Sequence, residues 1–360
     1  MKKLMKFGYS QTQNILKKNI SIHTNLLLSK PMQVSIQPNE RCNARCIMCD
    51  SWKETKDYIS KDEIIGVLSD LNDWVGNNFF VQIAGGEPLI YKGIFDIFSF
   101  CSDKKIITKI STNGISLTEN ICDKIIESGL QFLSVSLDSH LPEIHDKYRG
   151  VPGTFEKAVK GIEYLSANGK LTLGISSLLM KENVSSFPET VEYFLSLPID
   201  RFLFQPIRVW TEDLKPENWK EYEYWVNDEA AVKRTIEYLL EKKKTDARIF
   251  NSEQDIQDLK AYFNNPLSMV DSDNKKCYIG YDRIIINYKG DVTLGCARYG
   301  SVGNIKEQSI KEMWHSNKAA KIRKQMTRCK LPCTSNCYKQ TSLKQKIKKV
   351  TALKKSGLFR

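Results

Sequence analysis

The sequence predicts an α/β protein: a partial (β/α)6 barrel of TIM type over residues 32–206, followed by a small cysteine-rich C-terminal domain. Short apolar runs alternate with helical patterns six times between residues 32 and 206. Strands joined in this way pair in parallel through right-handed crossovers. Six strands are fewer than the eight that close a full barrel, so we expect an open, partial barrel.

The six strands are expected where apolar and polar residues alternate or where apolar residues run together. They are predicted over 32–37, 79–83, 106–111, 132–137, 171–175 and 201–206. The first helix of the barrel begins after Ser60, whose spacing to Glu63 is that of a capping box. Apolar residues at helical spacing predict four further helices, over about 91–103, 118–129, 154–168 and 186–197.

The segments outside the barrel differ from it in composition. A basic N-terminal extension (1–31) precedes the barrel, and a Trp-, Glu- and Lys-rich segment (207–275) is predicted to be a helical bridge. The cysteine-rich domain follows over 276–338, with a β-hairpin expected to turn at Lys289-Gly290. A basic tail (339–360) ends the chain.

The net charge of +12 lies in the two tails. Residues 1–39 hold six lysines and no acid, and residues 338–360 hold seven lysines and Arg360, again with no acid. Residues 40–337 are left at −2. Such tails suit peripheral contact with a membrane surface or an acidic peptide, or simply keep the protein in solution. Their few aromatic residues are not interleaved with the lysines, which disfavours nucleic acid as a partner.

The cysteines point to metal in a reducing compartment. No apolar run reaches the roughly 18 residues of a membrane span, and the N-terminus lacks a signal-peptide core, so we expect a cytoplasmic protein. Reducing compartments discourage disulfides, yet the chain has ten cysteines. Eight of them fall into two groups, which favours metal binding.

The first group is spaced Cys-x3-Cys-x2-Cys and consists of Cys42, Cys46 and Cys49. It follows the first strand, at the end of a barrel where catalytic residues gather. Three thiolates can hold three irons of a 4Fe–4S cluster and leave the fourth iron open to a ligand. A zinc knuckle is the alternative, but structural zinc takes four ligands, and the closest histidines in sequence are His23 and His140.

These three cysteines and their place after the first strand resemble those of the radical S-adenosylmethionine (SAM) superfamily, over about residues 32–206. The resemblance implies that the open iron binds SAM, and that one electron cleaves SAM to a 5′-deoxyadenosyl radical, which takes hydrogen from a substrate. It implies an external electron donor such as flavodoxin or ferredoxin. Met48 stands where the family usually has an aromatic residue against adenine, and a flexible thioether can fill that place.

Further segments at strand ends resemble the SAM-binding motifs of the family. The glycine-rich motif follows the second strand and consists of Gly85, Gly86, Glu87 and Pro88. Glycines there let the backbone approach the SAM amino group, and Glu87 is expected to help hold that cation. Three more residues are expected to contact SAM, namely Asn113, Ser136 and Arg149. The fixed positive charge of Arg149 is expected to meet the SAM carboxylate. For Ser111, Thr112 and Asp138, strand-end capping explains the residue equally well.

The second group resembles the SPASM or shorter twitch extension of radical SAM enzymes. Its members are Cys277, Cys296, Cys329, Cys333 and Cys337. A full SPASM module holds two clusters and needs about eight cysteines, so five predict one auxiliary 4Fe–4S cluster held by four of them. The sequence leaves open which cysteine is spare, and a four-cysteine zinc site is the alternative.

The sequence indicates the substrate less directly than it indicates the cofactors. An extension of about 31 residues is shorter than the leader-binding domain, roughly 80–90 residues, of many peptide-modifying relatives. That favours oxidation or rearrangement of a small molecule or sugar. A peptide-modifying maturase, forming an epimer, thioether or crosslink, is the alternative. A non-catalytic iron–sulfur electron carrier or regulator accounts for the cysteines but not for the glycine-rich motif.

Overall fold

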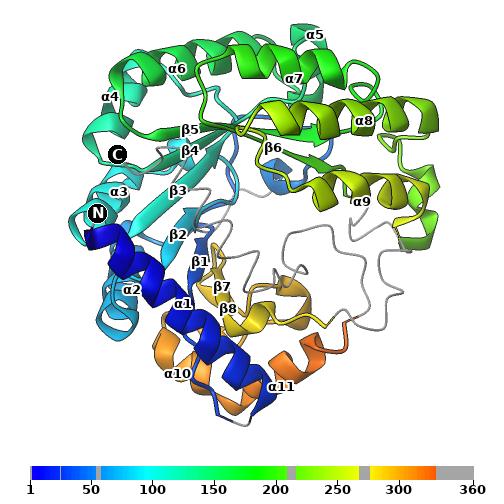
Figure 1. The fold of residues 1–360 in the computed structure, drawn as a ribbon. Coiled ribbons are helices and arrows are strands. Elements are labelled where there is room, and N and C mark those ends of the chain that lie inside the picture. The colour runs from blue at the N-terminus through cyan, green and yellow to red at the C-terminus, as the bar shows by residue number, and fades with distance from the viewer. Residues whose placement is uncertain (1, 25, 54–57, 209–215, 267–275, 330–360) are drawn as a thin grey trace.

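A computed structural model describes residues 2–24, 26–53, 58–208, 216–266 and 276–329. One nine-stranded sheet runs through the molecule, with helices packed along its outer side (Figure 1). The strand order is β6-β5-β4-β3-β2-β1-β7-β8-β9, and every pair from β6 to β7 is parallel. The sheet curves without closing, so the predicted α/β partial barrel is confirmed.

The six predicted strands all form, with bounds that shift by at most a few residues. They are β1 (Gln33–Ile36), β2 (Phe80–Ile83), β3 (Ile107–Thr112), β4 (Phe132–Ser136), β5 (Thr172–Leu179) and β6 (Arg201–Pro206). Alternation explains β1, where Val34 and Ile36 are buried and the residues between them are half-buried. The buried side chains of neighbouring strands stack in register, as Val34 does beside Val81.

The helices that return between these strands also match the sequence pattern. They are α2 (Lys61–Val75), α3 (Ile94–Asp103), α4 (Glu119–Glu127), α6 (Thr154–Asn168) and α7 (Phe187–Ser196), with a 3₁₀ turn η2 (Pro88–Ile90) before α3. The predicted capping box is present. Ser60 Oγ accepts from the Glu63 amide at 3.2 Å, and the Glu63 carboxylate accepts from the Ser60 amide at 2.8 Å.

One short helix, α5 (Pro142–Arg149), was not predicted. It lies between β4 and α6 and has only eight residues, most of them polar. Its buried side chains are His145, Tyr148 and Arg149, which form no apolar stripe that a sequence reading would recognise. Its C-terminal end matters for the site described below.

The cysteine-rich module continues the barrel sheet. Its first strand, β7 (Arg283–Ile286), pairs in parallel with β1, and β8 (Asp291–Thr293) and β9 (Gly303–Asn304) follow antiparallel. The predicted turn at Lys289-Gly290 is confirmed, with Gly290 at φ +89°. A 3₁₀ turn, η5 (Ile279–Tyr281), precedes β7, and two helices close the module, α10 (Ile310–His315) and α11 (Asn317–Met326).

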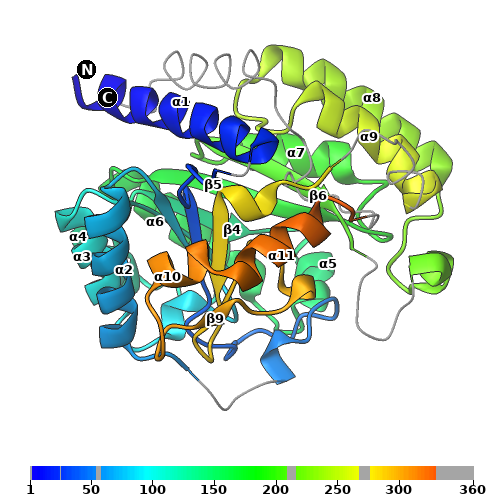
Figure 2. The ribbon, with the colours of Figure 1, turned by 90° about the horizontal axis from the view of Figure 1, so that it is seen from below.

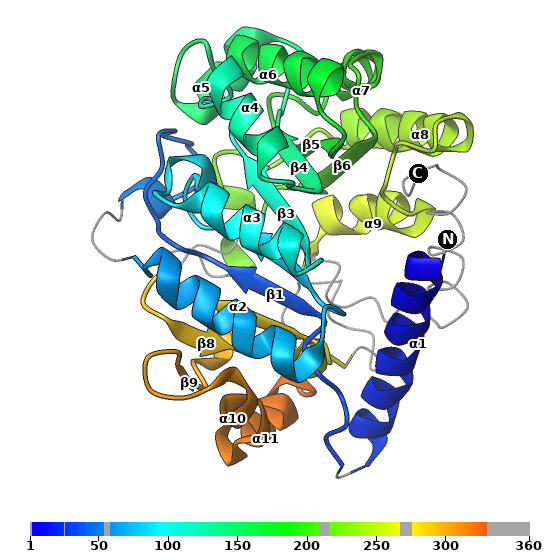
Figure 3. The ribbon, with the colours of Figure 1, turned by 90° about the vertical axis from the view of Figure 1, so that its left-hand side faces the viewer.

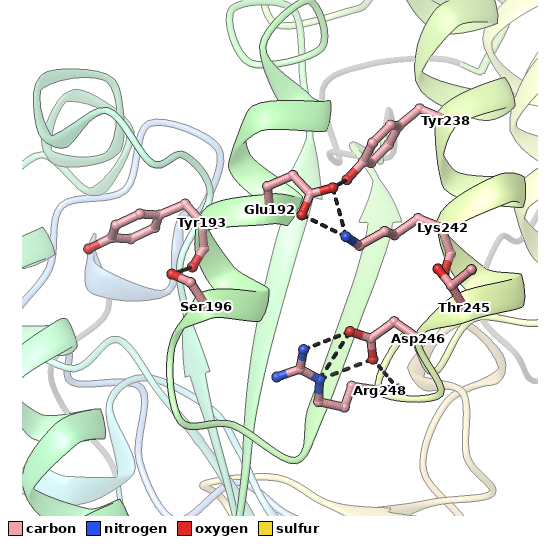
Figure 4. Close-up of polar contacts among 8 residues, drawn as sticks. All are labelled: Glu192, Tyr193, Ser196, Tyr238, Lys242, Thr245, Asp246 and Arg248. Carbon is pink, nitrogen blue, oxygen red and sulfur yellow. Dashed lines mark hydrogen bonds and ion pairs between the residues drawn. The ribbon is translucent and has the colours of Figure 1, made fainter.

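The bridge after β6 is helical where the structure describes it. It contains η3 (Pro216–Glu221), α8 (Glu229–Thr245) and α9 (Glu253–Asn264). A polar contact fixes α8 on the barrel: Glu192 of α7 accepts from Tyr238 and pairs with Lys242, with 2.6 Å between Lys242 Nζ and Glu192 Oε2 (Figure 4). These hydrogen bonds lower the pKa of Glu192.

The N-terminal extension forms a helix, α1 (Lys2–His23), on the margin of the molecule, where it contacts η5 (Figures 1 and 2). Within the described residues, no helix combines the length and apolar character needed to cross a membrane.

Candidate functional site

The first cysteine group lies on the loop that leaves the C-terminal end of β1. We call residues 42–49 the cysteine loop. Its three thiols are free and lie at different depths: Cys46 is buried, Cys42 is half-buried and Cys49 is exposed. Burial raises the pKa of both Cys42 and Cys46, and hydrogen bonds to each sulfur oppose that shift.

The glycine-rich motif packs directly on the chain that leads into the cysteine loop. The Gly86 amide donates to the Asn39 carbonyl at 3.1 Å, and the Glu87 amide donates to the Arg41 carbonyl at 2.8 Å. A Cβ at position 86 would lie 1.9 Å from the Arg41 oxygen, so no residue but glycine fits there. The motif therefore supports the loop that carries the cysteines.

Glu87 connects the glycine-rich motif to the end of β3. Only 2% of the residue is exposed, and its carboxylate accepts from Thr112 Oγ1 at 2.7 Å, from the Asn113 amide at 2.8 Å and from the Leu89 amide at 3.1 Å. Burial raises its pKa despite these three donors. A carboxylate has about four acceptor positions, so these three donors leave roughly one of them unused.

Asn113 reaches the cysteine loop from the end of β3. Its Nδ2 donates to Asn43 Oδ1 at 2.8 Å and lies 3.6 Å from Cys42 Sγ. Asn43 in turn donates to Ser116 Oγ at 3.0 Å. The sequence analysis placed Asn113 near SAM, and the structure adds a direct contact with the first cysteine. The role of Asn43 was missed, because a polar residue between two cysteines carries no signal of its own.

Helix α5 holds the other side of the loop. The Arg45 amide donates to the Arg149 carbonyl at 2.9 Å, and the Ile47 amide donates to the Tyr148 carbonyl at 3.1 Å. Gly150 ends the helix at φ +67°, and a Cβ there would lie 2.2 Å from the Arg45 oxygen. The cysteine loop is thus hydrogen-bonded to the chain on both of its flanks.

The Arg149 side chain joins a buried carboxylate to a buried thiol. Its Nη2 lies 2.7 Å from Asp138 Oδ2, and its Nη1 lies 3.9 Å from Cys46 Sγ. Among the described residues its buried Nε has no hydrogen-bond partner. Asp138 also accepts from the Leu178 amide at 2.9 Å. The positive charge of Arg149 therefore already interacts with Asp138 and Cys46 inside the protein, which the sequence did not indicate.

The remaining residues that the sequence assigns to SAM lie near the cysteine loop or at the C-terminal ends of the barrel strands. Pro88 is buried and begins η2. Met48 is half-buried and packs against the core. Ser136 ends β4 and pairs in register with Ser176 of β5. The described hydrogen bonds do not join Ser136 to the cysteine loop.

Three cysteines of the second group interact with Tyr299. Burial raises the pKa of this phenol, and further contributions come from Cys329, Cys296 and Cys277, in that order. The sequence did not single out Tyr299, which follows Cys296 by three residues. Cys333 and Cys337, assigned to the same cluster, lie outside the described residues.

The donor set fits an iron–sulfur cluster and SAM. Three thiols at the cysteine loop suit three irons. Arg149, whose Nη1 lies 3.9 Å from Cys46 Sγ, has a buried Nε to which the described residues offer no acceptor, so it could donate to a further anionic group. In the part of the chain that the structure describes, no three His, Cys, Asp or Glu side chains gather closely enough to hold a single metal ion.

Comparison with known proteins matches both cysteine groups. Residues 36–194 match the radical SAM superfamily, and residues 277–338 match the SPASM family, an iron–sulfur cluster-binding domain. The second match confirms the resemblance of the C-terminal cysteines. The cofactors of these two domains are 4Fe–4S clusters and SAM.

Curated relatives match only part of the chain. The AdoMet-dependent heme synthase of Methanosarcina barkeri is 28% identical over 169 residues, which are 46% of this chain and 48% of the relative. The mycofactocin maturase MftC of Mycolicibacterium smegmatis is 27% identical over 164 residues, 45% of this chain and 41% of the relative. The chain thus matches less than half the length of each.

A solved structure supports the fold over a longer stretch. SuiB of Streptococcus suis, bound to its precursor peptide SuiA, superposes with a TM-score of 0.64 at 19% identity. The superposition covers 86% of this chain and 71% of SuiB. At this identity the likeness concerns the fold.

Proposed function

The chain is a member of the radical SAM superfamily with a C-terminal iron–sulfur SPASM domain, and from this premise we propose that it uses SAM to modify a peptide. Cys42, Cys46 and Cys49 would hold the SAM-binding 4Fe–4S cluster. When bound, this cluster and SAM supply a 5′-deoxyadenosyl radical. The radical chemistry in this proposal rests on the cysteine loop, which the glycine-rich motif and helix α5 hold on its two flanks.

The residues around the loop would orient the bound cofactors. Asn113 and Arg149 place N–H groups beside the sulfurs of Cys42 and Cys46 and would stabilise their thiolate forms. The unpartnered Nε of Arg149 would serve the SAM carboxylate, and the remaining acceptor position of Glu87 would serve its amino group.

Two comparisons support a peptide as the substrate. SuiB was solved with a precursor peptide, and MftC is named a maturase. The short N-terminal extension favoured a small molecule or sugar in the sequence analysis. An external electron donor such as flavodoxin or ferredoxin would complete the reaction.

An iron porphyrin is the second candidate, because the first curated relatives are AdoMet-dependent heme synthases and an Fe-coproporphyrin III synthase. Both candidates use the same cysteine loop and differ only in what lies against it. They are therefore separated by substrate assays on one preparation.

The first experiment tests the radical chemistry. The protein is reconstituted anaerobically with iron and sulfide, reduced with dithionite and supplied with SAM, and 5′-deoxyadenosine is measured. Release is expected, with loss in Cys42→Ala, Cys46→Ala and Cys49→Ala. Cys101→Ala and Cys122→Ala are matched controls, because both thiols are buried in helices α3 and α4 away from the loop. No release from the wild-type protein would favour the electron-carrier alternative.

The second experiment tests the substrate. Short peptides encoded beside the gene, and iron porphyrins, are added to the active preparation, and both 5′-deoxyadenosine and product mass are followed. A peptide is expected to raise the release of 5′-deoxyadenosine and to change its own mass. A mass change in the porphyrin alone would replace the peptide proposal with the second candidate.

A further inference from the structure

The N-terminal segment carries an unusual share of the exposed apolar surface. Seven large apolar side chains are exposed in the described residues, and four of them lie between residues 16 and 28. These four are Leu16 (49% exposed), Ile20 (44%), Leu26 (62%) and Leu28 (42%). The other three are scattered singly over the rest of the chain. Single exposed apolar residues need no explanation, but a cluster of them marks a contact surface.

The fold places two of these side chains on one face of α1 and holds a third beside the helix. Leu16 and Ile20 are four residues apart on α1 and therefore share one face of the helix. After the helix the chain folds back, because Ser21 Oγ accepts from the Leu28 amide at 2.8 Å and from the Ser29 amide at 2.9 Å. Leu28 is thereby held beside the last turns of α1. We call Leu16, Ile20, Leu26 and Leu28 the α1 patch.

The opposite side of α1 is fixed to the protein body. Asn14 and Ser21 are buried, and Lys18 pairs with Asp282 next to β7. The Trp314 indole of α10 donates to the Ser29 carbonyl at 2.9 Å. These contacts hold α1 along the margin of the molecule, as Figure 3 shows, with the α1 patch turned to solvent.

The surroundings of the α1 patch are positively charged. Residues 1–39 contain six lysines and no Asp or Glu. Lys17 is exposed between Leu16 and Ile20. Lys30 lies on the side of the protein body, where its Nζ donates to the Trp74 carbonyl at 2.5 Å. An apolar patch inside a field of lysines is the pattern of helices that lie on membrane surfaces.

We propose that the α1 patch docks the protein on the surface of an anionic lipid bilayer. The leucine and isoleucine side chains would enter the boundary between headgroups and acyl chains, and the exposed Lys17 would face the anionic headgroups. A second copy of the chain is a poorer occupant of the same patch, because a two-fold contact would bring the two lysine-rich segments together.

The test uses the full chain and vesicles sedimented with the protein. Phosphatidylcholine vesicles with added phosphatidylglycerol are expected to bind the protein, and phosphatidylcholine alone is expected to bind it weakly. Raised salt should weaken the binding. Leu16→Ser/Ile20→Ser should lower the partition coefficient on the order of tenfold or more, through the lost apolar contact. Lys17→Glu should weaken binding to the anionic vesicles alone.

Phe250→Ser is the matched control, because Phe250 is 42% exposed but lies outside the α1 patch. It should bind vesicles as the wild type does. Melting temperature and 5′-deoxyadenosine release, measured for every variant, establish that folding is retained. Equal binding to both kinds of vesicle, or full binding by the double serine variant, would overturn the proposal. The proposal would also be overturned if the wild type were a dimer that does not bind vesicles and the double serine variant were a monomer in analytical ultracentrifugation.

Discussion

The guanidinium of Arg149 lies beside the thiol of Cys46, with 3.9 Å between Nη1 and Sγ, and the same group pairs with the fully buried Asp138. A charged network therefore runs from the segment after β4 to the cysteine loop. Its positive end lies next to the second cysteine, where it favours negative charge on the sulfur.

Replacing Arg149 with methionine should destabilise the protein. Asp138 would remain buried without its partner, which costs about 3–5 kcal/mol for a broken buried ion pair. The double variant Arg149→Met/Asp138→Asn should regain most of that stability, because asparagine can still accept from the Leu178 amide. Chemical denaturation measures both.

The same double variant separates electrostatics from folding. Without a positive charge and an N–H donor beside Cys46, the reconstituted cluster should reduce at a more negative potential than in the wild type. A redox titration followed by electron paramagnetic resonance gives the value. An unchanged potential at full iron content would mean that Arg149 has a structural role only.

Gly86→Ala should disrupt the cysteine loop. Its Cβ would lie 1.9 Å from the Arg41 carbonyl oxygen, so the backbone before the loop must move. We expect loss of most of the iron bound at Cys42, Cys46 and Cys49 and of 5′-deoxyadenosine release. Gly66→Ala is the control, because nothing lies within 4 Å of a Cβ at that helical position. It should retain iron and gain about 0.5–1 kcal/mol of stability.

His145 should make the iron-free protein sensitive to acid. Burial lowers the pKa of this imidazole from 6.5 to about 4, and its Nδ1 accepts from the Asp138 amide at 3.2 Å. As the pH falls from 6.5 to 4, the unfolded chain binds a proton that the folded chain does not. The free energy of unfolding should therefore fall, by up to about 3 kcal/mol.

His145→Asn tests this contribution, because its side-chain oxygen can still accept from the Asp138 amide and it does not titrate in this range. Its stability should be lower at pH 7, through lost packing against Phe155, and should vary less with pH. A wild-type and a variant curve of equal slope between pH 6.5 and 4 would refute the assignment.

Alanine at each C-terminal cysteine should identify the ligands of the auxiliary cluster. Cys277, Cys296 and Cys329 all interact with Tyr299, so we expect each of the three variants to lose the iron of that cluster. The fourth ligand is then Cys333 or Cys337, and the other should be replaceable without loss of iron. Iron and sulfide analysis of each variant gives the answer. Equal loss in all five would contradict a cluster held by four.

Local patterns predicted the barrel well, because its strands and helices each carry their own signal. Alternation gave β1, and the spacing of Ser60 and Glu63 gave the start of α2. The pairing of β7 with β1 left no such trace, since the two strands are about 250 residues apart and meet only in the folded sheet. The barrel and the cysteine-rich module thus share one sheet.

The site was predicted in its composition more than in its contacts. Cysteine spacing identified the metal-binding loop, and a strand followed by two glycines identified its neighbour. Glu87 and Arg149 were assigned to SAM, but their buried protein partners depend on how β3, α5 and the loop pack. Those contacts arise from tertiary structure, which one sequence does not display.

The place of β1 in the sheet also bears on the order of assembly. β1 is hydrogen-bonded to β2 on one side and to β7 on the other. During synthesis it remains an edge strand until the ribosome has released residues 283–286. The strand that leads into the cysteine loop thus gains its second neighbour only late in translation.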